Sequence, residues 1–176
     1  MKATIIILLM ITYAAFADIG ISTGVGSSSY SVGVLNKQRI SAQNEFVSLD
    51  INHELNEAEY VSLSNVISNY RQGSRSILTE YELQTCFMKQ LTTNNAFGIG
   101  FNFSLILNDN VPDTLFVGNG FGLNFKYVRT ITKSIALNMQ MISNNYIVAP
   151  ASDTKNSSFS NQTFRLFLTF FPESGT

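Results

Sequence analysis

The residue types that usually carry catalysis or bind metal ions are scarce in this chain. It contains one histidine, His53, and one cysteine, Cys86. A general base must lie within hydrogen-bond reach of a nucleophile, and nothing near His53 in the sequence supplies one. One histidine and one cysteine without ligand-like spacing do not make a metal site, and a lone thiol cannot form an internal disulfide. We therefore expect no enzyme activity, no cofactor and no metal, with His53 in a structural role at an interface.

Five charged residues have a more informative spacing. They fall on the polar phase of segments in which apolar and polar residues alternate. If that phase faces the inside of a barrel, the charges share a narrow lumen, where an unpaired charge would be costly. We expect a structural network in which the arginine and the lysine neutralise some of the acids. The alternative is that the charges line a path for ions or solutes. The five residues are Asp50, Glu80, Glu82, Lys126 and Arg165.

Strict alternation of apolar and polar residues, the period of a β-strand, is the dominant pattern in the chain. It is clearest from Phe97 to Leu107 and recurs from Phe121 to Tyr127 and from Phe164 to Phe170. The polar positions hold mostly Gly, Ser, Asn and Gln. Such small groups suit a lumen filled by its own side chains, whereas the bulky apolar set suits lipid. The pattern favours a membrane barrel over a soluble β protein.

The composition supports this interpretation. Charged residues make up 13% of the chain, against about a quarter in soluble domains. The aromatic fraction is 12% and includes 14 Phe. The formal net charge of -1 provides no basic field for nucleic acid, and no run of Lys or Arg is present.

The first residues have the pattern of a cleavable secretory signal. A positive start at Lys2 precedes an apolar run from Ile5 to Ile11, and Ala15-Phe16-Ala17 predicts cleavage before Asp18. The run is shorter than the roughly 20 residues of a membrane-spanning helix. We predict a signal peptide at 1–17, export, and one barrel domain at 18–176. No later stretch is apolar enough to cross a bilayer as a helix, so any span must consist of strands.

The alternating segments predict an all-β fold, a single antiparallel transmembrane barrel of about eight strands. Each strand is at least about ten residues long, as a tilted membrane strand requires. The predicted strands are 18–35, 44–55, 58–69, 76–90, 96–107, 115–129, 134–146 and 161–171.

The connections alternate in kind, with short turns on one side and mostly longer, polar loops on the other, as in outer-membrane barrels. One place fits less well, because the apolar phase of the first strand changes across Gly26 to Ser29. We interpret that change as a β-bulge; a turn is the alternative. The short links are 56–57, 91–95 and 130–133, and the others are 36–43, 70–75, 108–114 and 147–160.

These features resemble the small outer-membrane barrels of the OmpA, OmpX and OmpW kind. The resemblance rests on Ala15-Phe16-Ala17, on the eight amphipathic segments and on the aromatic last strand from Phe164 to Phe171. It is a match of architecture and not of a residue motif. It implies a barrel surrounded by lipid in a bacterial outer membrane.

Three functions fit such a chain. The first is a non-enzymatic barrel with a structural or surface-interaction role, in which residues 147–160 form the contact surface. The second is a porin-like or lipid-holding assembly, in which several barrels form a homo-oligomer. The third is a secreted, lipocalin-like carrier with its apolar face inward around a fatty ligand.

Overall fold

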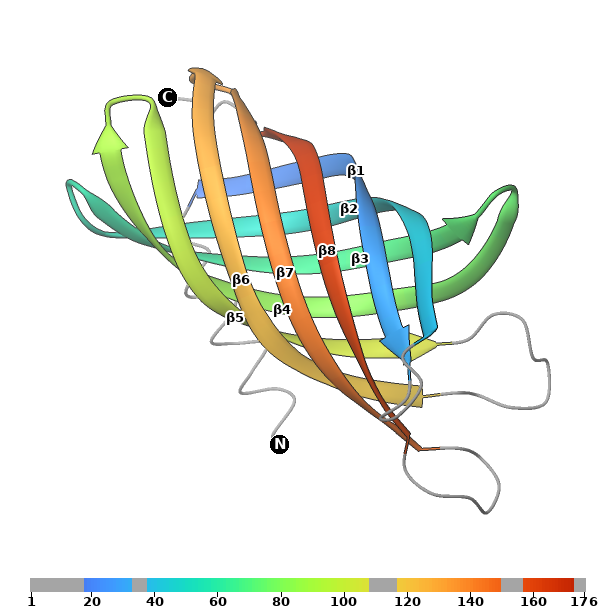
Figure 1. Ribbon diagram of the computed structural model, residues 1–176. Coiled ribbons are helices and arrows are strands. Elements are labelled where there is room, and N and C mark those ends of the chain that lie inside the picture. The colour runs from blue at the N-terminus through green and yellow to red at the C-terminus, as the bar shows by residue number, and fades with distance from the viewer. Residues whose placement is uncertain (1–17, 33–37, 108–116, 150–156, 173–176) are drawn as a thin grey trace, which may run out of the picture.

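The computed structural model describes residues 18–32, 38–107, 117–149 and 157–172, which form one closed barrel of antiparallel strands (Figure 1). Each strand pairs with its neighbours in the sequence, and the first pairs with the last. The predicted eight-stranded, all-β architecture is confirmed. The strands are β1 Asp18–Val32, β2 Gln38–Asn56, β3 Glu59–Gln72, β4 Arg75–Thr92, β5 Asn95–Leu107, β6 Val117–Thr132, β7 Ile135–Ala149 and β8 Ser157–Phe170.

The alternation in the sequence separates two faces of the barrel. Along β5, Phe97, Ile99, Phe101 and Phe103 lie on the outer face, where Phe101 is 57% exposed. The glycines and polar residues between them are buried inside. A membrane barrel requires this arrangement. A lipocalin-like carrier needs the opposite one, with the large apolar side chains around an internal ligand.

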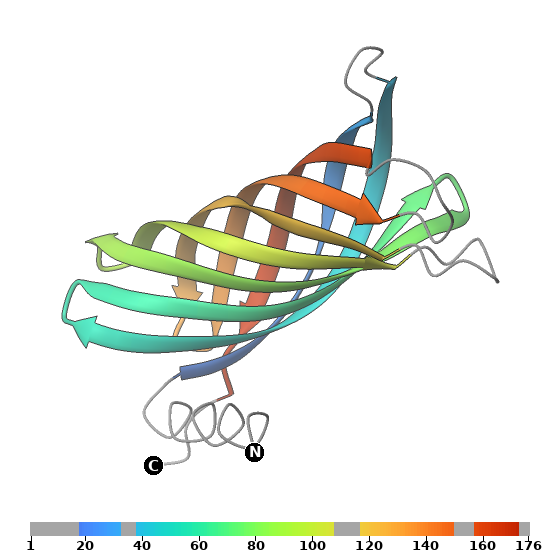
Figure 2. The ribbon, with the colours of Figure 1, turned by 90° about the horizontal axis from the view of Figure 1, so that it is seen from below.

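The register of the strands gives the barrel its tilt. Ile21 of β1 pairs with Leu49 of β2, which in turn pairs with Asn65 of β3. When such pairs are followed from strand to strand around the barrel, they lead to Ser160 of β8, whose partner on β1 is Ser31. One circuit of the barrel therefore shifts the register by ten residues. Such a stagger tilts the strands against the barrel axis, as Figure 2 shows. At this strand number the interior is just wide enough for side chains to fill.

Three two-residue turns join strands at the end of the barrel where β1 begins and β8 ends, here called the turn end. In each turn the side-chain oxygen of Asn56, Thr92 or Thr132 accepts a hydrogen bond from the backbone N–H two residues on. These bonds stabilise the turns locally. The opposite end is called the loop end. The three turns are residues 57–58, 93–94 and 133–134.

The predictions for the β3–β4 connection and for a bulge in β1 are wrong. Residues 70–75 are not a longer loop, because β3 and β4 continue until only two residues separate them, and Gly73 adopts the left-handed φ of 64° that the tight turn uses. The first strand has no bulge, because its pairing with β2 and β8 runs without a register shift. The apolar pattern changes there because the outward positions hold Ser27 and Ser29.

Other predictions concern residues beyond the described part. The signal peptide at 1–17 lies outside it and stays a prediction. The predicted link at 108–114 also lies outside it, as do parts of the predicted links at 36–43 and 147–160. The other residues of these two links are not loop, because 38–43 belong to β2, 147–149 to β7 and 157–160 to β8. In the described ranges, no helix is long and apolar enough to span a membrane.

Two arginine substitutions on the outer face of β6, one at mid-strand and one beside a turn, test which part of the surface meets lipid. Phe125 lies on the outer face of β6 between Ile99 and Met141 of the neighbouring strands, and Ile131 lies on the same face beside a turn. Phe125→Arg should lower the free energy of unfolding by about 2–4 kcal/mol, and Ile131→Arg by about 0–1 kcal/mol, because arginine is costly only near the bilayer centre. Urea titration in lipid vesicles measures both; equal losses would contradict this orientation.

Candidate functional site: the charged lumen

All five charged residues predicted for the lumen lie inside the barrel. Glu80 and Arg165 are fully buried, and Lys126, the most accessible of the five, is 5% exposed. The structure places them in two groups and not in one network. Arg165, Glu80 and Glu82 form a loop-side group, whereas Asp50 and Lys126 form a turn-side group.

Arg165 of β8 is the centre of the loop-side group. Its guanidinium forms an ion pair with Glu82 of β4, in which Nη1 donates to Oε2 at 3.2 Å and Nη2 donates to Oε1. Nη2 also donates to Ser68 Oγ at 2.8 Å, and Gln84 Nε2 donates to Glu82 Oε2 at 2.8 Å. A two-pronged arginine–carboxylate contact is among the stronger polar interactions in proteins.

Two phenols hold Glu80. Tyr70 donates to Glu80 Oε2 at 2.5 Å, and Tyr146 donates to Oε1. Asn144 Nδ2 donates to the Tyr146 hydroxyl at 2.7 Å. A Cβ at Gly120 would overlap the Tyr146 ring, so the missing side chain there makes room for this tyrosine.

Asp50 and Lys126 form the turn-side group. Lys126 Nζ lies 3.6 Å from Asp50 Oδ1 and donates to Ser62 Oγ at 3.3 Å. Three serine hydroxyls donate to the Asp50 carboxylate, so its buried charge is well solvated by the protein. They belong to Ser22, Ser48 and Ser64.

An aromatic pair lies between the two groups. Phe46 and Phe167 meet edge to face, with ring centroids 5.2 Å apart, and pack with Val66. The Arg165 guanidinium lies 4.9 Å from the Phe46 centroid, and the Lys126 ammonium lies 5.7 Å from the Phe167 centroid. Each cation therefore gains a favourable contact with a ring face, and the apolar layer separates the two groups.

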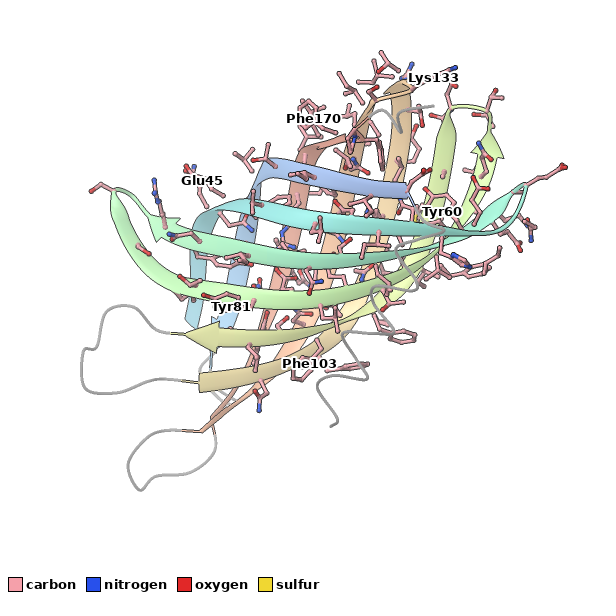
Figure 3. The ribbon with its side chains drawn as sticks, turned by 180° about the vertical axis from the view of Figure 1, so that it is seen from behind. Glu45, Tyr60, Tyr81, Phe103, Lys133 and Phe170 are labelled. Carbon is pink, nitrogen blue, oxygen red and sulfur yellow. The ribbon has the colours of Figure 1, made fainter. Side chains whose placement is uncertain are left out.

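The turn side of the lumen is hollow. A cavity of about 580 Å³ opens there, and Asp50, Lys126 and Asn138 are among its lining residues. Tyr60 and Lys133, labelled in Figure 3 near the turn end, also line it. The turn-side ion pair thus borders a polar vestibule.

The sequence also singled out a histidine and a cysteine. His53 lies on β2 near the turn end, two positions from Ile51, as expected. Cys86 is buried in the lumen and contacts the side chain of Asn124. Among the described residues, no cluster of three or more His, Cys, Asp or Glu could hold a metal ion.

The aromatic residues of the site are not among those predicted from the sequence. Tyr70, Tyr146 and Phe46 share the inward phase with Ser68, Asn144 and Ser48, so their position inside the barrel could have been recognised. The residues that these aromatic side chains contact could not be predicted, because the contacts depend on how the barrel closes.

Solved structures of other proteins share this architecture. No protein-family model matches the sequence, and no curated protein matches it. The solved structure of Neisserial surface protein A aligns with a TM-score of 0.52 at 6% identity, covering 86% of this chain and 96% of that one. The outer membrane protein AlkL, solved by solid-state NMR in lipid bilayers, aligns with a TM-score of 0.51 at 10% identity, covering 91% and 93%. This chain has the fold of a small outer-membrane β-barrel.

The resemblance to small outer-membrane barrels is thus confirmed at the level of the fold. An outer-membrane barrel meets lipid on its outer face, and that face of this chain carries exposed Phe, Leu and Ile. The predicted location in the outer membrane agrees with both observations. Identities of 6% and 10% transfer the fold and no residue roles.

A double-mutant cycle tests the loop-side ion pair. Arg165→Met or Glu82→Gln alone should each destabilise the barrel by about 3–5 kcal/mol, because each leaves a buried partner without its countercharge. The double variant should lose much less than the sum of the two.

The control cycle uses the exposed pair Arg71–Glu45, whose charged atoms are 3.7 Å apart. Its coupling should be below about 1 kcal/mol. Urea unfolding in vesicles provides all the values. Additive losses at Arg165 and Glu82 would show that their contact does not contribute to stability.

Proposed function

We propose that this protein is a non-enzymatic bacterial outer-membrane barrel with a structural or surface-interaction role, and that its lumen is closed. The proposal rests chiefly on hydrogen bonds that join strands on opposite sides of the barrel. Arg165 of β8 bonds to β3 and β4, and Lys126 of β6 bonds to Ser62 of β3. Since these strands are not neighbours, such bonds must cross the lumen.

Two further contacts reinforce the obstruction on the loop side. Gln140 of β7 donates to Gln84 of β4 at 2.7 Å, and Tyr146 of β7 donates to Glu80 of β4. A solute would have to break several buried bonds to pass, and each buried polar group left unpaired is costly. These contacts favour a structural role for the charges over a path for ions.

The non-enzymatic part of the proposal draws on the surroundings of the titratable groups. The Lys126 ammonium is engaged by Asp50, so it is poorly suited to act as a general base for Ser62. His53 is only three positions from Asp50 on β2, but it lies on the opposite, outward phase of that strand near the turn end, so it does not share the lumen with either group. Surface interaction is assigned to residues 147–160, whose serine and asparagine content suits polar contacts.

The porin-like alternative requires an open path through each barrel. The cross-lumen bonds argue against such a path, although they leave open the association of closed barrels in the membrane plane. A lipid-holding role would then belong to the outer surface and not to the lumen.

Conductance in planar bilayers tests the closed lumen. The wild-type protein should give no unitary conductance steps. A variant that removes the central obstruction, Phe46→Ala with Glu82→Ala and Arg165→Ala, should conduct if the barrel still folds, which a heat-modifiable gel shift verifies.

The matched control removes two rings from the outer face. Phe101 and Phe121 are stacked there with centroids 5.9 Å apart, and replacing both with alanine should leave the bilayer silent. Regular unitary steps from the wild-type protein would overturn the proposal of a closed barrel.

A further inference from the structure

The apolar outer face includes an amide on β3. Asn65 of β3 is exposed on that face. Its outward neighbours along the strand are Leu63 and Ile67, and the residues paired with it on the adjacent strands are Leu49 and Leu83. The carboxamide is therefore surrounded by four aliphatic side chains, three of which are themselves 43–49% exposed: Leu49, Ile67 and Leu83.

A carboxamide that faces hydrocarbon without a hydrogen-bond partner is unfavourable. Thr23 shows how another outward polar residue avoids this. It lies between Val47 and Leu168, and its hydroxyl donates to the backbone carbonyl of Phe46 at 3.3 Å. The Asn65 amide makes no hydrogen bond to any residue in the described part of the chain. It thus presents two N–H donors and a carbonyl acceptor to its surroundings.

A groove lies beside Asn65 on the same face. Its volume is about 270 Å³, and it extends over β3, β4 and β5. Tyr81 and Phe103, both labelled in Figure 3, border it on neighbouring strands. Its other outward-facing lining residues are Ile67, Leu83 and Leu105. Because the outer surface is concave beside the Asn65 amide, the surface of a second molecule can approach that amide closely.

We propose that the β3–β5 face around Asn65 is the contact surface between two copies of this chain in the membrane. Acyl chains can fill an apolar groove, but they carry no group that bonds an amide. A second Asn65 does, because a carboxamide is both donor and acceptor and is complementary to itself. Two copies related by a two-fold axis near Asn65 pair their amides and bring the same face together. Hydrogen bonds of this kind contribute to association between membrane-spanning elements.

This inference rests on the lipid-facing orientation in the proposed function. Energy transfer between labelled barrels in lipid vesicles tests it. The labels are attached to a cysteine in place of Lys133, an exposed turn residue, with Cys86→Ala as background. Donor- and acceptor-labelled protein are mixed, and the lipid-to-protein ratio is varied to obtain a dimer dissociation constant.

The unaltered interface should give a saturable transfer signal with dimer stoichiometry. Asn65→Leu should raise the dissociation constant about tenfold, as expected for the loss of one or two interchain amide bonds. Thr23→Val, which removes a polar group already bonded within the barrel, should change it by less than about twofold.

Two outcomes overturn the proposal. One is a monomer at every lipid ratio, and the other is a dimer whose dissociation constant is unaffected by Asn65→Leu. A heat-modifiable gel shift is recorded for each sample. A monomer that retains the shift contradicts the dimer alone, whereas failure to insert and shift contradicts the membrane barrel as well.

Discussion

The structure depends on one constraint, that every backbone N–H and C=O group in hydrocarbon must be hydrogen-bonded within the protein. Strands can meet it only when the sheet has no open edge. Here β1 pairs with β8 along twelve residues, from Ile21 to Val32, and this pairing closes the barrel. The bulky outer face and the polar interior are arranged around that closure.

A closed barrel of eight strands leaves little internal space, and this decides the chemistry of the lumen. Small residues make room for a few large ones, as Gly120 does for the Tyr146 ring. The charges that remain inside are then held close to partners across the lumen. Arg165 reaches Glu82, and Lys126 reaches Asp50, with the Phe46–Phe167 pair between them. The bonds that stabilise these charges also obstruct the passage.

The parts of the fold that could be predicted follow from local pattern. A period of two identified all eight strands and the inward phase of the five charged residues. It failed where the outward positions of β1 hold serine, at Ser27 and Ser29, since the contrast between the faces disappears there. The pairing of the charges could not be predicted, because it depends on a ten-residue stagger that accumulates around the whole barrel. Asp50 therefore meets Lys126, which is 76 positions away in the sequence.

The orientation of the two faces is tested most directly by spin labels placed one at a time along β5, from Phe97 to Ser104, in a Cys86→Ala background. Labels at odd positions should be accessible to oxygen dissolved in the bilayer and protected from a water-soluble nickel complex. Labels at even positions should be shielded from oxygen. A uniform oxygen profile, or a nickel complex that reaches the odd positions at mid-strand, would contradict the assignment of the apolar face to lipid.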